Sequence, residues 1–328
     1  MRNAEIILGI IRNRGERRLP LENIYRQLFN RELYLCAYNR LYKNDGAMTP
    51  GSTSETVDAM SLEKIDTIIE QLRYEKYRWT PVRRVMIPKA SQRGKYRPLG
   101  LPTWSDKLLQ EVICSILEPY YEPQFSRYSH GFRPQRGCHT ALSEIRENWR
   151  GTKWYIEGDI SKCFERVNHE KLLSILSRNL HDNRLLRLIN NLLKAGYLED
   201  WKYNKTLSGV PQGSICGPIF SNIYLNELDQ FVESKLLPTY NQGNRRRNFL
   251  PYHNLIATAQ RRKIAGKQKE AKLLRKQAQQ MPSSDPQDPT FRRLRYVRYA
   301  DDRLLGLMGT REEAEVIKCQ IAEFLFNE

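Results

Sequence analysis

The pair Asp301-Asp302 lies between two strand-like runs, 294–298 and 303–308. A short polar link between two such runs predicts a β-hairpin with both acids at its tip. Adjacent strand residues normally face opposite sides, but at a tight turn both can approach one site. A third acid, Asp159, ends a separate strand-like run at 154–160. The pattern therefore predicts an α/β (α+β) fold in which three carboxylates from two segments meet.

Three neighbouring carboxylates repel one another unless cations neutralise them. Mg²⁺ prefers oxygen ligands and readily shares substrate phosphates. Two such ions about 3.5–4 Å apart stabilise the attacking and leaving oxygens of an in-line displacement. The acids thus predict phosphoryl transfer with two Mg²⁺ ions, or with Mn²⁺ as a substitute. An Asp-Asp pair alone also occurs in ordinary polar turns, so this prediction depends on the motifs around it.

The net charge indicates a polyanionic partner. The 328 residues include 54 Lys and Arg against 37 Asp and Glu, a formal charge of +17. Nucleic acid is the first partner to expect for such a chain. Residues 241–298 hold fifteen of the basic side chains and three of the acidic ones, a net +12, while the other 270 residues carry +5.

The middle of this segment, 256–280, is rich in Ala, Lys, Gln and Arg and predicts a basic helix. One interpretation is an arm that lies along RNA phosphates. The other is a solvated insertion, and folding upon binding would satisfy both. The candidate RNA-binding residues are Arg245, Arg246, Arg247, Arg261, Arg262, Lys263, Lys267, Lys269, Lys272, Arg275 and Lys276.

Several classes of protein are not expected. No run approaches the roughly 18 apolar residues of a membrane span, so a membrane partner is not expected. The first residues contain no secretory signal. The six cysteines are scattered and the five histidines form no HxxxH or HExxH pattern, which argues against zinc and favours reduced cysteines.

Other elements follow from periodicity and turn residues. Residues 82–88 and 96–101 predict two strands joined by a basic turn. Helices are expected over 61–77, after an N-cap at Ser105, from about Asn168, and from the 207–214 loop through Asn226.

An ordered set of motifs along the chain resembles those of reverse transcriptases. Tyr299-Ala300-Asp301-Asp302 looks like the YxDD box, 158–164 like the first catalytic-aspartate block, and 209–214 like the PQG loop. Residues 87–99 resemble the basic fingers hairpin. Residues 130–139 and the turn at 46–51 are similar to group II intron-encoded reverse transcriptases, also called maturases.

The resemblance implies a right-hand polymerase fold with fingers and palm, an N-terminal helical extension and no thumb. The implied divisions are an extension and fingers helices at 1–80, a fingers hairpin at 81–102, palm at 103–167, further fingers at 168–212, and palm again at 213–328 with a basic insertion at about 241–290.

It also implies roles for individual residues. Asp159, Asp301 and Asp302 would hold the two metal ions, with the Ile160 carbonyl as a further ligand. Four residues would bind the nucleotide: Lys89 and Arg97 face the triphosphate, Phe164 excludes a 2′-OH by its bulk, and Gln212 contacts the incoming nucleotide.

The implied function is RNA-directed DNA synthesis together with intron RNA binding for splicing and retrohoming. The expected partners are group II intron RNA, an RNA template with a DNA primer, and dNTPs, in a bacterial cytoplasm rather than an organelle. A piece without a thumb is expected to be weakly active or inactive and to expose apolar surface suited to a homodimer. Two alternatives remain: a splicing cofactor with little polymerase activity, and a retron-type reverse transcriptase.

Overall fold

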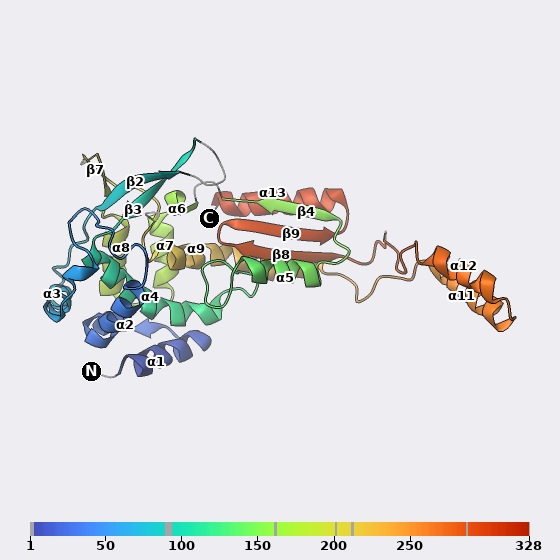
Figure 1. Cartoon of the computed structure of the whole chain (residues 1–328), viewed down its shortest axis with the longest axis horizontal. Coiled ribbons are helices and arrows are strands. Elements are labelled where there is room, and N and C mark those ends of the chain that lie inside the picture. Colours follow the sequence, from blue (N-terminus) through green and yellow to red (C-terminus); the bar gives the residue numbers. More distant parts are fainter. Residues whose placement is uncertain are drawn as a thin grey trace.

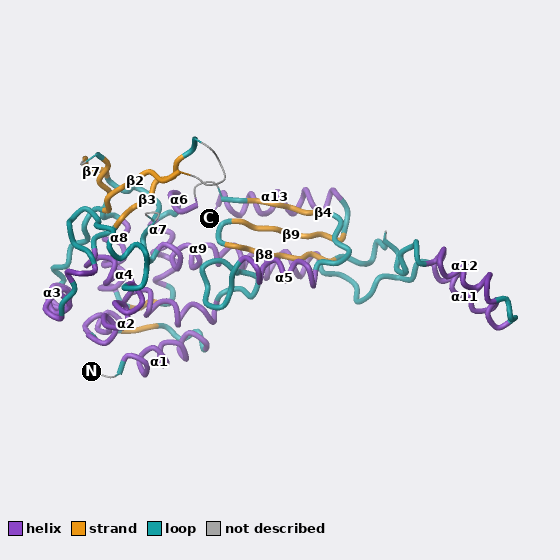
Figure 2. Tube along the Cα trace, viewed as in Figure 1, coloured by secondary structure: helices purple, strands orange, loops and turns teal. Residues whose placement is uncertain are grey.

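The computed structural model describes residues 3–88, 94–160, 163–200, 202–210, 213–286 and 288–327. The molecule is elongated (Figure 1). A mainly helical part carries the N-terminus, a sheet with flanking helices forms the middle, and a helical hairpin projects at the far end. Figure 2 shows that the strands gather in the first two parts.

The helical part is built around long amphipathic helices whose apolar faces share one core. The N-cap side chains of Ser61, Thr103 and Asn168 accept backbone N–H groups of α3, α4 and α7, which fixes where these helices begin. The cap of α4 is Thr103 and not Ser105, whose hydroxyl donates to Glu55 instead. The helices are α1 (Ala4–Glu16), α2 (Arg31–Leu41), α3 (Leu62–Arg73), α4 (Trp104–Tyr121), α7 (His169–Ser177) and α8 (Asn183–Leu193), with short helices η1 (Ile24–Phe29), η2 (Val57–Ala59) and η3 (Glu122–Gln124).

Two small sheets belong to this part. The predicted hairpin is present as β2 (Val82–Pro88) and β3 (Tyr96–Leu101), which pair antiparallel. The sheet continues through β6 (Tyr197–Glu199) and β7 (Lys202–Asn204) in the order β3-β2-β6-β7. The two-residue strands β1 (Leu21–Glu22) and β5 (Leu180–His181) pair in parallel.

The central sheet has the order β4-β9-β8 and is antiparallel throughout. Its strands are β4 (Trp154–Gly158), β8 (Arg293–Tyr299) and β9 (Asp302–Met308), which confirms the strands predicted around the acids. Leu294, Tyr296, Leu305 and Leu307 alternate onto one face and pack against the helix α13 (Arg311–Asn327) and the end of α9 (Gly217–Phe231). Helix α5 (Cys138–Asn148) packs against Val297 and Leu304 on the opposite face.

Helix α9 connects the helical part to the central sheet. Ile219, Phe220 and Ile223 near its start belong to the core of the helical part, and Leu228 near its end belongs to the core under the sheet. The helix continues into η4 (Val232–Leu236) and α10 (Leu237–Tyr240). Because one helix serves both cores, the end of the sheet that carries the acids is held firmly against the helical part.

The basic segment forms two helices where one was expected over 256–280. These are α11 (Leu250–Ile264) and α12 (Gln268–Ala278), packed as an antiparallel hairpin. The chain reverses at Gly266, whose φ of 79° lies in the left-handed region that glycine adopts at little cost. Within the described part of the chain, no helix is long and apolar enough to cross a membrane.

Candidate active site

The acid pair occupies a tight turn. Strands β8 and β9 pair up to Tyr299 opposite Asp302, so Ala300 and Asp301 form a two-residue link. Ala300 has a φ of 55°, a left-handed conformation that costs a residue with a Cβ roughly 1–2 kcal/mol. The turn is therefore held by surrounding contacts and not by its own backbone preference.

Asp159 reaches the same end of the sheet from β4. The last paired residues of β4 and β9 are Gly158 and Arg303. Because side chains alternate along a strand, Glu157 and Asp159 lie on the face that also carries Asp302. The structure thus brings together the three acids that the sequence singles out, and it adds Glu157 as a fourth nearby carboxylate.

The electrostatics of Asp302 reflect this crowding. Partial burial raises the pKa of Asp302, and the charges of Asp301, Asp159 and Glu157 raise it further. A raised carboxyl pKa means that the folded chain disfavours the ionised form, which a bound cation would reverse.

The donor chemistry fits Mg²⁺, which takes carboxylate oxygens. Among the described residues, no three His, Cys, Asp or Glu side chains are arranged as a ready metal site. The side chains of Asp159 and Asp302 are exposed.

Ile160 and Asp301 both lie close to the short helix α6 (Cys163–Arg166). The Ile160 carbonyl accepts the Cys163 backbone N–H at 3.0 Å, which leaves one lone pair for another partner. Burial raises the pKa of the Cys163 thiol, and the charge of Asp301 raises it further. Asp301 therefore lies near α6, while its neighbour Asp302 shares a face of the sheet with Asp159.

Phe164 lies in α6, half-buried, with its ring edge-on to Phe132 at 6.1 Å between centroids. The loop after β7 packs against it, since Val210 N–H donates to the Phe164 carbonyl at 2.6 Å. On the other side of this loop, a Cβ at Gly213 would lie 2.3 Å from the Gly100 carbonyl oxygen in β3. Val210 thus lies against α6 and Gly213 against the β2–β3 hairpin.

Arg97 is exposed on β3, the strand that this loop contacts. Two other predicted nucleotide-binding residues, Lys89 and Gln212, lie outside the described residues. The structure therefore places Arg97 and Phe164 on elements that meet through one loop, and it leaves Lys89 and Gln212 as predictions.

The candidate RNA-binding residues gather on the projecting arm and at its base. Ten of the eleven are exposed, and Arg246 is half-buried with its guanidinium over the Phe291 ring. Glu270 lies 3.5 Å from both Arg262 and Lys267, and Asp285 is 2.7 Å from Arg247. With so few acids against so many cations, the surface of the arm is strongly positive, at the end of the molecule farthest from the helical part (Figure 1).

Two features near the acids escape sequence reasoning. A buried ion pair joins Arg298 of β8 to Asp229 of α9. Gly131 lies so close to the turn that a Cβ there would be 2.2 Å from the Ala300 nitrogen. Arg298 gives a signal in hindsight, because it alternates with the inward-facing Leu294 and Tyr296, and an inward arginine requires a buried acid.

The chain is similar to reverse transcriptases and to proteins encoded by introns. A family model described as "Reverse transcriptase (RNA-dependent DNA polymerase)" matches residues 87–326. The chain is 42% identical over 311 residues to the Group II intron-encoded protein LtrA of Lactococcus lactis subsp. cremoris, covering 93% of this chain and 52% of LtrA.

Two eukaryotic relatives are similar over nearly as much of the chain. The "Uncharacterized 91 kDa protein in cob intron" of Schizosaccharomyces pombe is 40% identical, covering 92% of this chain and 37% of that protein. "Nuclear intron maturase 2, mitochondrial" of Arabidopsis thaliana is 25% identical, covering 90% of this chain and 45% of that protein. The chain thus spans about half the length of LtrA and less of these two relatives.

Proposed function

Because the chain belongs to the reverse transcriptases encoded by group II introns, we propose that it carries the catalytic centre that copies RNA into DNA. The observation that carries the proposal is the meeting of Asp159, Asp301 and Asp302 at one end of the sheet, where partial burial and the charges of Asp301 and Asp159 raise the pKa of Asp302. Primer extension on an RNA template, by wild type and by Asp301→Asn, tests it.

The proposed reaction is nucleotidyl transfer. The 3′-OH of a DNA primer attacks the α-phosphate of a dNTP, a new P–O bond forms, and pyrophosphate leaves. Asp159, Asp301, Asp302 and the Ile160 carbonyl would hold two Mg²⁺ ions, which stabilise charge on the attacking and leaving oxygens when bound. Mn²⁺, which also accepts oxygen ligands, is a reasonable substitute.

We assign nucleotide binding to residues around the same end. Arg97, with Lys89, offsets the charge of the triphosphate. Gln212 is assigned a contact with the incoming nucleotide. The same reasoning assigns residues 1–80 to an N-terminal extension and fingers helices, 81–102 and 168–212 to fingers, and 103–167 and 213–328 to palm.

Phe164 is proposed to select deoxyribonucleotides by occupying the space of a 2′-OH. Phe164→Val is expected to raise incorporation of ribonucleotides relative to deoxyribonucleotides by about tenfold or more, since a pocket enlarged by several methylenes loses that discrimination. Competition between matched rNTP and dNTP substrates measures the ratio. Phe164→Tyr keeps the bulk and serves as the control; equal ratios for all three proteins would remove Phe164 from this role.

The arm is proposed to bind intron RNA through phosphate contacts. Replacing Arg261, Arg262, Lys263, Lys267, Lys269, Lys272, Arg275 and Lys276 by Ala is expected to weaken RNA binding and to flatten its salt dependence. Removing one phosphate contact reduces the steepness of log K against log salt by about 0.7–0.9. A variant that exchanges Arg for Lys and Lys for Arg at the same positions keeps the charge and should keep the slope. An unchanged slope in the alanine variant would remove the arm from RNA binding.

The group II membership favours roles in splicing and retrohoming over a retron-type enzyme. A splicing cofactor with little polymerase activity is a second candidate, and the exposed cations of the arm support RNA binding in either case. Wild-type primer extension separates the two. LtrA comes from a bacterium and the Arabidopsis relative is named mitochondrial, so the compartment stays a prediction.

A further inference from the structure

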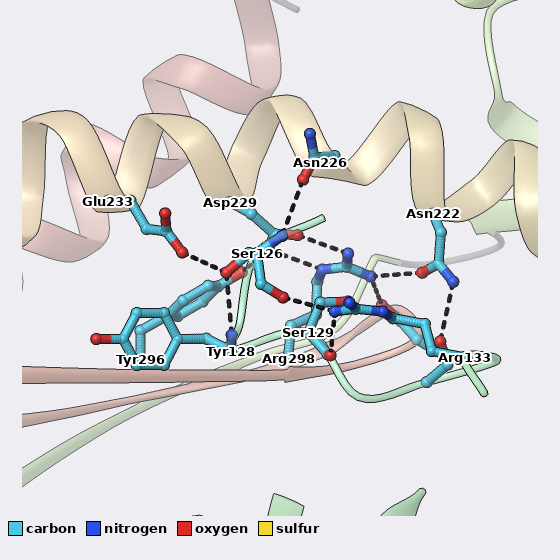
Figure 3. Close-up of polar contacts among 12 residues, drawn as sticks. Ser126, Tyr128, Ser129, Arg133, Asn222, Asn226, Asp229, Glu233, Tyr296 and Arg298 are labelled. Atoms are coloured by element: carbon cyan, nitrogen blue, oxygen red, sulfur yellow. Dashed lines mark hydrogen bonds and ion pairs between the residues drawn. The ribbon is translucent and has the colours of Figure 1, made fainter. Parts of the chain in front are cut away.

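A buried charge network lies directly beneath the acid turn. The side chain of Arg298 in β8 is 1% exposed and that of Asp229 in α9 is fully buried. The Arg298 Nη2 and Nε atoms lie 2.6 and 2.9 Å from the two carboxylate oxygens of Asp229, a bidentate arrangement. Figure 3 shows the pair between α9 and β8, with the Tyr296 hydroxyl also directed at Asp229.

The third nitrogen of the same guanidinium reaches the turn itself. Nη1 of Arg298 donates to the Ala300 carbonyl at 2.7 Å and to the Asn222 Oδ1 at 3.3 Å. The Asn222 amide in turn donates to the Gly131 carbonyl at 2.9 Å. One buried side chain therefore ties together α9, the loop at Gly131 and the peptide that immediately precedes Asp301.

The backbone of Arg298 is also held by hydrogen bonds to the segment 128–130. Its N–H donates to the Tyr128 carbonyl, and its carbonyl accepts the His130 N–H, both at 2.8 Å. Ala300 follows in a left-handed conformation with a φ of 55°. The unfavourable turn thus begins at a strand end whose main chain and side chain are both held.

An ion pair that only stabilised the fold would need no contact beyond Arg298 and Asp229, whereas Arg298 also donates to the Ala300 carbonyl. Although burial acts to lower the pKa of Arg298, the adjoining Asp229 carboxylate and its hydrogen bonds outweigh this and raise the pKa above its ordinary value, so the charge is retained. A lysine could satisfy the charge of Asp229, but it lacks the planar fork that reaches Asp229 and the Ala300 carbonyl together.

We propose that Arg298, held by Asp229, is a positioning residue that fixes the Ala300–Asp301 turn and so aims the carboxylates of Asp301 and Asp302. The inference rests on the proposed function, in which these carboxylates hold the metal ions. It adds an interaction, the hydrogen bond from Arg298 to the Ala300 carbonyl, that holds the turn in its unfavourable conformation when no metal is bound.

The test separates positioning from stability with a double variant. Arg298→Met alone leaves the buried Asp229 charge unpaired and is expected to destabilise the fold. Asp229→Asn with Arg298→Met removes both charges, keeps similar volume and retains an acceptor for the Tyr296 hydroxyl. The double variant should therefore recover much of the melting temperature that the single variant loses.

Three measurements follow on each protein: Mn²⁺ binding by EPR titration, primer extension, and hydrogen exchange of the peptide covering 299–302. We expect the double variant to bind Mn²⁺ about tenfold or more weakly, the usual scale for losing an outer partner of metal ligands. Extension should fall in parallel and exchange at the turn should rise. Wild-type values for all three in a stable double variant would overturn the proposal.

Arg298→Lys covers the case in which the double variant fails to fold. It keeps the charge opposite Asp229, and positioning predicts the same weakened Mn²⁺ binding and faster exchange; full activity with Lys would overturn the proposal. Tyr296→Phe is the matched control, since it removes a hydrogen bond to Asp229 without touching the turn.

Failure of the proposed function gives a different result. If Asp301→Asn binds Mn²⁺ and extends primers like wild type, the metal assignment falls. Hydrogen exchange at 299–302 in the Arg298 variants still reports whether Arg298 holds the turn.

Discussion

Asp301→Asn is expected to abolish primer extension by the full-length protein, while its intron RNA binding stays near wild type. Asparagine keeps the shape of the side chain but removes one of the charges that would hold a metal ion. The expected loss is on the order of 10²–10³-fold, the scale of removing one preorganised electrostatic contact to the transition state. RNA binding should persist because the cations of the arm lie beyond the opposite end of the central sheet (Figure 1).

The measurement is single-turnover extension of a DNA primer on an RNA template, alongside RNA binding at fixed salt. Asp58→Asn, an exposed residue in the helical part, is the matched control and should change neither. Extension by Asp301→Asn at the wild-type rate would contradict the assignment of the acid pair. A parallel loss of RNA binding would instead indicate a folding defect.

Gly131→Ala is expected to displace the acid turn. The added Cβ would lie 2.2 Å from the nitrogen and 2.8 Å from the Cα of Ala300, and backbone atoms cannot rotate away as a flexible side chain can. Relief of such an overlap typically costs about 1–3 kcal/mol of stability. Because the shift moves Asp301, extension should fall by up to about a hundredfold, the effect of a misplacement of about 1 Å.

Gly137→Ala is the control in the same stretch of chain, since a Cβ there meets nothing within 4 Å. Its φ of −169° is extended backbone that alanine adopts readily. Thermal melting and extension of the two variants give the comparison. Wild-type extension by a folded Gly131→Ala protein would show that the close contact with Ala300 does not control the turn.

The strands beside Asp301 and Asp302 are predictable because their alternation is clear and the turn between them is short. The hairpin of β2 and β3 is predictable for the same reason. The pattern of residues marks Asp159 as a candidate only because it stands at the end of a strand-like run. That β4 pairs with β9 on the side away from β8, which puts Asp159 beside Asp302, is a long-range choice that local pattern does not specify.

Other features could not be predicted because they depend on partners distant in the chain. Arg298 and Asp229 are 69 residues apart, and nothing local indicates that they pair. Gly131 and Ala300 meet through the packing of a loop against a strand end. In the arm, composition favours helix throughout, and the break at Gly266 replaces one expected helix with two.

In the proposed mechanism, Asp159, Asp301 and Asp302 together hold two catalytic metal ions. Anomalous scattering from Mn²⁺, in crystals with an RNA template, a DNA primer and a non-reactive dNTP analogue, tests it most directly. Two peaks are expected between these three carboxylates and the nucleotide phosphates, about 3.5–4 Å apart. Bound nucleotide with no Mn²⁺ within coordination distance of the three acids would contradict it.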